Sequence, residues 1–109
     1  MDSIEIAFSI IAEAGDARSS AMEAVSKAQE GDFAAAEALL SVSSDALQKA
    51  HEVQTDMIAR EMSGDGDGTP IGLIMAHAQD HLMCAGIVKD MASLLLEQWK
   101  RIDALERNR

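Results

Sequence analysis

A chain of 109 residues is long enough for one modest hydrophobic core, so we expect a single domain over residues 1–109. Its 19 acidic and nine basic side chains give a formal net charge of −10, which argues against nucleic acid and anionic membrane surfaces as partners. No apolar run approaches the roughly 20 residues of a bilayer span. Cys84 is the only cysteine, so no internal disulfide can form, and we expect a cytoplasmic protein.

The composition favours helices. Three aromatic residues and one proline stand beside many alanine, leucine, methionine and glutamate residues. Such a composition is typical of helical proteins and disfavours a β-sandwich. The predicted fold class is therefore all-α.

The first predicted helix covers about residues 3–30. Asp2 is placed to cap it, and Glu5 three residues later resembles the second half of a capping box. A stripe of mostly small side chains repeats at helical spacing and would let another helix approach closely. Its members are Ala7, Ile10, Ala14, Ala17, Ala21, Ala24 and Ala28.

Turn and capping residues in the rest of the sequence predict two more helices. Gly31 and Asp32 indicate a tight turn into a second, antiparallel helix over about residues 33–62. A glycine-rich loop follows over residues 63–69, where Thr69 would cap a third helix with Pro70 at its first position. That helix covers about residues 70–105, and the expected architecture is an antiparallel three-helix up-down-up bundle.

The third helix carries a stripe that we interpret as a buried apolar seam with polar interruptions. Its members are Leu73, His77, Asp80, His81, Cys84, Val88, Met91, Leu95, Trp99 and Ile102. Other apolar side chains point away from this stripe, yet a lone three-helix bundle buries one face of each helix. We therefore expect other subunits or a docking protein to cover a second face.

His77, Asp80 and His81 share one helical face because they are spaced at i, i+3 and i+4. Three interpretations fit. His77 could take up a phosphoryl group as a neutral imidazole nucleophile. The three side chains could be metal ligands, although a closed zinc site needs a fourth. They could also be core histidines bridged by Asp80, and the spacing alone leaves the choice open.

Four segments carry a resemblance to a known family. They are His77-Ala-Gln-Asp-His-Leu-Met83, Ala14-Gly-Asp-Ala-Arg-Ser19, Glu30-Gly-Asp-Phe33, and Ala50-His51 with Gln54-Thr55. Together they resemble the lactose/cellobiose-specific enzyme IIA family of the bacterial phosphoenolpyruvate-dependent sugar phosphotransferase system. The resemblance covers nearly the whole chain and favours the phosphoryl interpretation.

The resemblance implies a role for each matching residue. His77 would accept a phosphoryl group from the carrier protein HPr and hand it to the cognate IIB component during disaccharide uptake, of the lactose, cellobiose or diacetylchitobiose type. Asp80 would lie beside its two copies on the axis of a homotrimer and bind a divalent cation there. We expect Mg²⁺, because this ion prefers oxygen ligands. Gln79 and His81 would line or support the site.

Two further expectations bear on the site. With a helix starting at Pro70, His77 would lie about two turns inside it, too far for the free amides of the helix start to hold phosphate oxygens. The phosphoryl group would then be stabilised by side chains. The alternative function is a non-catalytic oligomeric helical bundle or metal-binding interaction protein with structural histidines.

Overall fold

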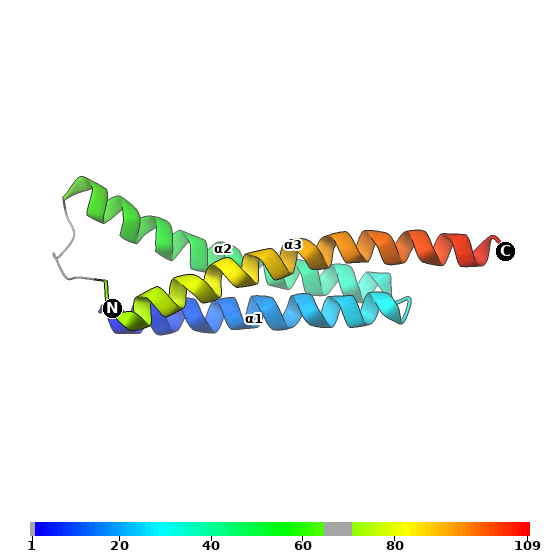
Figure 1. The fold of residues 1–109 in the computed structure, drawn as a ribbon, viewed down its shortest axis with the longest axis horizontal. Helices are drawn as coiled ribbons and strands as arrows, with labels where there is room; N and C mark the ends of the chain where they lie inside the picture. The colour runs from blue at the N-terminus through cyan, green and yellow to red at the C-terminus, as the bar shows by residue number, and fades with distance from the viewer. Residues whose placement is uncertain (1, 65–70) are drawn as a thin grey trace.

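The computed structural model describes residues 2–64 and 71–109, which form three helices. They are α1 over Ser3–Gln29, α2 over Phe33–Ser63 and α3 over Leu73–Arg107. Helices α1 and α3 run in the same direction and α2 runs against them (Figure 1). No strand occurs in the described residues, so the all-α up-down-up prediction is confirmed. Within the same ranges, no helix has both the length and the apolar content that a membrane span requires.

The predicted N-terminal caps of α1 and α2 are confirmed by their hydrogen bonds. The Asp2 carboxylate accepts from the Glu5 backbone N–H at 2.8 Å, and the Asp32 carboxylate accepts from Ala35 at 3.1 Å. Gly31 has a φ of +85°, in the left-handed region that glycine adopts without steric cost. The chain therefore reverses within three residues, which holds α1 and α2 side by side.

The core is built where the alanine stripe of α1 meets the other two helices. Every member of the predicted stripe is buried. Small residues also dominate the buried positions of the partner helices, which are Ala36, Ser43, Ala46, Leu47 and Ala50 in α2 and Met75, Ala78, Leu82, Ala85, Ala92 and Leu96 in α3. At one of these contacts the buried Ser43 hydroxyl donates to the Ala17 carbonyl at 2.7 Å. The helices approach closely because alanine fills little space.

The orientation predicted for α3 is wrong. Most of the stripe interpreted as a buried seam faces outward: Leu73 is 89% exposed, and His77, Asp80 and Cys84 are exposed as well, whereas Trp99 packs against the core. The inner face of α3 is instead the row from Met75 to Leu96, most of which is alanine or leucine. A closely packed contact with an alanine stripe favours small side chains. Most of the larger apolar residues of α3 therefore lie on the surface of the chain.

The start of α3 also differs from the prediction. The helix begins at Leu73 rather than at Pro70, and its capping residue Gly72 makes no side-chain hydrogen bond. The predicted cap at Thr69 and Pro70 lies outside the described residues. At the other side of the connection, α2 continues through Ser63 and ends at Gly64, whose φ is +82°. The rest of the predicted loop, residues 65–69, is likewise outside the described ranges.

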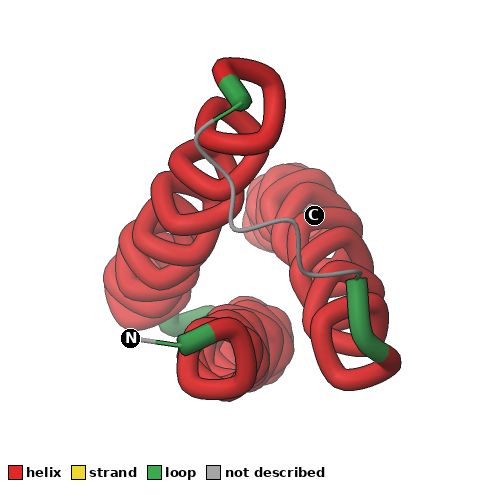
Figure 2. The backbone as a smooth tube through the Cα atoms, turned by 90° about the vertical axis from the view of Figure 1, so that its left-hand side faces the viewer, coloured by secondary structure: helices red, strands yellow, loops and turns green. Residues whose placement is uncertain are grey.

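The last part of α2 diverges from α3. Figures 1 and 2 show its end leaning away from the other two helices, whereas its first half lies against them. A pocket of about 480 Å³ opens between the diverging end of α2, the beginning of α3 and the N-terminus of α1. Its wall includes Met57, Met75 and Ile71, so it is largely apolar.

Candidate functional site

The two histidines of α3 contact each other directly. The Nε2 atoms of His77 and His81 lie 3.0 Å apart, and the rings meet edge to face with centroids 4.5 Å apart and planes at 89°. One helical turn separates the two residues, which brings their side chains together on the surface. His77 is exposed and His81 is half-buried, so the second ring supports the first from the helix side.

This contact restricts where protons sit. An imidazole–imidazole hydrogen bond needs one Nε2 that carries a proton and one that does not. When His81 donates, His77 is neutral and keeps a lone pair on Nε2. That is the form in which an imidazole acts as a nucleophile at physiological pH. The arrangement therefore places an exposed imidazole on the surface of α3, with a second imidazole against it.

His77 lies closer to the helix start than the sequence indicated. It follows Leu73, the first residue of α3, by four positions, so about one turn separates it from the helix start. The N–H groups of a first helical turn have no helical acceptors and give the helix end a partial positive charge. Side chains on a helix also point back toward its N-terminus. The expectation that free amides are too distant to help is therefore wrong by about one turn.

Asp80 lies apart from the histidine contact. It is exposed, and within the described ranges no hydrogen bond or ion pair joins it to His77 or His81. The interpretation of two core histidines bridged by Asp80 is therefore wrong. Asp80 instead lies on one line with Leu73 and Ile87, seven residues before and after it, which are 89% and 64% exposed.

In the described part of the chain, the outer face of α3 exposes more large apolar side chains than either of the other helices. We use this name for its exposed large hydrophobic residues, which are Leu73, Met83, Ile87, Met91, Leu94, Leu95, Ile102 and Leu105. Monomeric soluble proteins rarely expose a contiguous apolar surface of this kind, and where it occurs it marks an interaction site. Asp80 lies within it as the acidic interruption.

Gln79 points to the other side of α3, toward α2. Its side-chain carbonyl accepts a hydrogen bond from the Gln54 amide, and its own amide nitrogen lies 3.6 Å from the Met75 sulfur. Both glutamines line the apolar pocket, whereas neither histidine does. Gln79 therefore joins α3 to α2 behind the site, and the pocket is separate from the imidazole chemistry. No role for Gln54 was predicted from the sequence; its position one turn after the buried Ala50 was the available signal.

One chain does not provide a complete metal site. Within residues 2–64 and 71–109, no three histidine, cysteine, aspartate or glutamate side chains are close enough together to hold an ion. Asp80 offers oxygen ligands of the type that Mg²⁺ prefers, but only one carboxylate per chain. A site at Asp80 therefore fits only if several copies of the chain share it.

Two other candidate residues lie on the surface. Cys84, expected on a buried seam, is exposed. His51 is exposed on α2 and forms no contact with the histidine pair in the described part of the chain. Among the histidines of the chain, His77 and His81 are therefore the pair in contact.

The chain is similar in sequence to a known family over most of its length. Residues 5–100 match the family described as "PTS system, Lactose/Cellobiose specific IIA subunit". The lactose-specific EIIA component of Staphylococcus aureus is 44% identical over 96 residues, which are 88% of this chain and 91% of that protein. The lichenan-specific phosphotransferase enzyme IIA component of Bacillus subtilis is 45% identical over 98 residues, 90% and 87% of the two chains.

Solved structures show the same architecture. The cellobiose-specific enzyme IIA from Bacillus anthracis superposes with a TM-score of 0.87 at 37% identity, covering 95% of this chain and 94% of that one. The chitobiose IIA protein of Escherichia coli, solved in complex with HPr, gives a TM-score of 0.79 at 33% identity, covering 94% and 99%.

Proposed function

Since the chain belongs to the lactose/cellobiose-specific IIA subunits, which are phosphotransferase components of the sugar phosphotransferase system, we propose that His77 carries the phosphoryl group. It accepts the group from the phosphohistidine of HPr and passes it to the cognate IIB component. The observation that carries this proposal is the exposed His77 ring, whose Nε2 lies 3.0 Å from that of His81.

The transfer is an exchange of one P–N bond for another. A lone pair on a His77 ring nitrogen attacks the phosphorus, and the bond from phosphorus to the HPr imidazole breaks with its electrons returning to that ring. Such a reaction needs in-line positioning and neutralisation of charge more than covalent chemistry by the protein. An exposed imidazole on a rigid helix meets the first requirement, because a visiting protein can approach it.

His81 contributes a hydrogen bond to the phosphoryl group on His77. Before transfer its Nε2 lies 3.0 Å from that of His77, and this contact orients the His77 ring. Once phosphorus is attached to His77, the His81 Nε2–H is within reach of a phosphoryl oxygen. A charge-assisted bond of this kind is roughly twice as strong as a neutral one. The positive end of α3, about one turn away, adds to the stabilisation of the phosphoryl group.

The relatives support the proposed partners and pathway. The E. coli neighbour was solved as a complex with HPr, and the other relatives are named for lactose, lichenan or cellobiose. We therefore propose HPr as the donor, a IIB component as the acceptor, and uptake of a disaccharide of the lactose, cellobiose or diacetylchitobiose type. As proposed, the transfer takes place in the cytoplasm.

The active form we propose is a homotrimer built on the outer face of α3. Three copies of this face would bury one another's apolar residues around a common axis, with Asp80 between Leu73 and Ile87. Three carboxylates meeting there would repel. The three Asp80 carboxylates would together hold a divalent cation of the Mg²⁺ type, whose charge would remove that repulsion.

Reconstitution tests the function directly. The protein is incubated with phosphoenolpyruvate, enzyme I and HPr, and acid-labile phosphate on the chain is measured. We expect labelling of the wild type, none in His77→Ala and full labelling in His51→Ala, a matched control because His51 is also an exposed helical histidine. Label that persists in His77→Ala would show that another residue carries the phosphoryl group, and a wild-type chain that takes up none would favour the non-catalytic helical bundle instead.

A further inference from the structure

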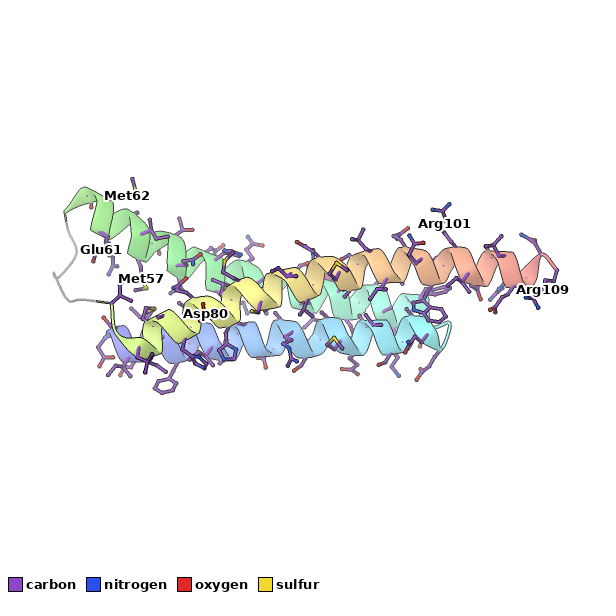
Figure 3. All side chains as sticks on the ribbon, in the orientation of Figure 1. Met57, Glu61, Met62, Asp80, Arg101 and Arg109 are labelled. Atoms are coloured by element: carbon purple, nitrogen blue, oxygen red, sulfur yellow. The ribbon has the colours of Figure 1, made fainter. Side chains whose placement is uncertain are left out.

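The apolar pocket between the diverging end of α2 and the beginning of α3 has no part in the proposed phosphoryl transfer. Its volume of about 480 Å³ lies within the range of roughly 300 to 1,000 Å³ that is typical of small-molecule sites. Figure 3 shows Met57 and Glu61, which both line the pocket, extending from the side of α2 that faces the other two helices. Packed protein interiors leave few voids larger than a water molecule, so a space of this size can hold a ligand.

The wall of the pocket is built mostly from large apolar side chains. Ile58, Met62 and Ile71 line it and are 52%, 84% and 82% exposed, so they contact water in the free chain. Met75 also lines it, from the core of the bundle. Methionine side chains are flexible and adapt to ligands of different shape. A bound molecule that covers this surface would gain hydrophobic binding energy, so the wall favours an apolar ligand.

A pair of side-chain amides provides the polar contacts of the pocket. Gln54 and Gln79 both line it, and the Gln54 amide nitrogen donates to the Gln79 carbonyl oxygen. In the described part of the chain, the Gln54 carbonyl oxygen accepts no hydrogen bond, and the Gln79 amide nitrogen contacts only the sulfur of Met75, a weak acceptor. The pair therefore offers one acceptor and one donor side by side. An amide group in a ligand carries the complementary donor and acceptor.

The same wall excludes other classes of ligand. Among its described residues Glu61 is the one with a charged side chain, so the pocket disfavours phosphates and other anions. A sugar has a hydroxyl group on most of its carbon atoms, and each one needs a partner when it is buried. The wall offers few such partners, so the pocket does not fit the disaccharide whose uptake is proposed.

We propose that this pocket binds a small, uncharged and largely apolar molecule that carries an amide group. The ligand N–H donates to the Gln54 carbonyl oxygen, and the ligand carbonyl accepts from the Gln79 amide nitrogen. The apolar part packs against the methionine and isoleucine side chains of the wall, and so joins the end of α2 to the beginning of α3. Neither histidine of α3 lines the pocket, so the inference goes beyond the proposed function and does not depend on it.

Binding of a matched pair of probes to the full-length protein tests the site and the ligand class. N-benzylacetamide carries the amide, and benzyl acetate has the same size and shape but no N–H. Nuclear magnetic resonance of isotope-labelled methionine methyl groups is the measurement. We expect titration with the amide to shift the signals of Met57, Met62 and Met75, and to leave those of Met22 and Met91, which lie outside the pocket. Unshifted pocket methionines, or equal shifts at all five, would overturn the proposal.

Substitution of the two glutamines tests the hydrogen bonds. In Gln54→Leu/Gln79→Leu the pocket stays apolar, and we expect the affinity for the amide relative to that for the ester to fall about tenfold, because two hydrogen bonds are lost. Gln48→Leu is the matched control, since this glutamine is exposed on α2 outside the pocket. An affinity ratio that is the same in the double variant and in the wild type would overturn the proposed ligand class.

Filling the pocket tests its location. Met57→Trp places a larger side chain in the space, and we expect it to abolish the shift of the Met75 signal. Met22→Trp makes the same change at an exposed position of α1 and should leave binding unchanged. His77→Ala should also bind the amide as the wild type does. Binding that survives Met57→Trp, or that is lost in His77→Ala, would place the probe outside this pocket and overturn the proposal.

Discussion

His81 lies one turn after His77 on α3, and its Nε2 is 3.0 Å from the Nε2 of His77, with the two rings nearly perpendicular. In this contact the N–H of one ring donates a hydrogen bond to the lone pair of the other. It also means that a phosphoryl group on His77 Nε2 would displace His81 from that atom. In the proposed function, His81 would therefore act as a positioning residue whose hydrogen bond changes partner during transfer.

Substitution of His81 should show which of its properties matters. His81→Phe keeps a planar ring without a donor, and we expect phosphoryl transfer from HPr to slow by about tenfold to a hundredfold. His81→Gln keeps an N–H donor and should retain most of the rate. Initial rates of labelling are the measurement. A faster rate in His81→Phe than in His81→Gln would show that ring packing, not the donor, is what His81 contributes.

Asp80 gives a test of the trimer that does not involve the imidazoles. Asp80→Leu replaces clustered charge by an apolar side chain on the line of Leu73 and Ile87, so we expect the trimer to be kept or strengthened while bound metal is lost. Sedimentation equilibrium and metal analysis are the measurements, with Asp80→Asn as the polar control. Dissociation of the leucine variant into monomers would show instead that the ion holds the assembly together.

Local signals predicted most of the fold. Asp2, Gly31 and Asp32 carry their own capping chemistry, so the ends of α1 and the start of α2 follow from adjacent residues. The alanine stripe of α1 is a single small-residue face, and it predicted the buried side of that helix. The His77–His81 contact likewise follows from helical spacing.

The orientation of α3 could not be predicted from the sequence, because that helix is apolar on two sides. Periodicity shows that Leu82 and Ile87 lie on different faces, but it does not say which face meets the chain's own helices. That choice depends on the small residues across the contact, such as Ala17 and Ala21, which favour alanine in return. The Gln54–Gln79 bond joins residues 25 positions apart, so no local pattern contains it.

The glutamine pair between α2 and α3 should stabilise the fold as a unit. Gln54→Leu removes the donor and leaves the half-buried Gln79 carbonyl without it, and we expect a loss of about 1 kcal/mol in the free energy of unfolding. The double variant Gln54→Leu/Gln79→Leu should recover part of the lost stability, because two apolar side chains fit the apolar pocket beside them. Chemical denaturation of the two variants and of Gln79→Leu alone gives the coupling. Strictly additive losses would mean that the two amides do not stabilise each other.

Ser43 is the most sharply defined polar contact in the core. It is fully buried, and its hydroxyl donates to the Ala17 carbonyl of α1. Ser43→Ala removes this bond between helices, which is worth about 1 kcal/mol, but it also gains up to about 0.5 kcal/mol of helix propensity. Ser41→Ala on the exposed side of α2 gains the propensity alone, so the difference between the two variants isolates the hydrogen bond. We expect Ser43→Ala to be the less stable of the two by about 1 kcal/mol in urea denaturation. Equal stabilities would show that close packing of α1 on α2, rather than this hydroxyl, sets the contact.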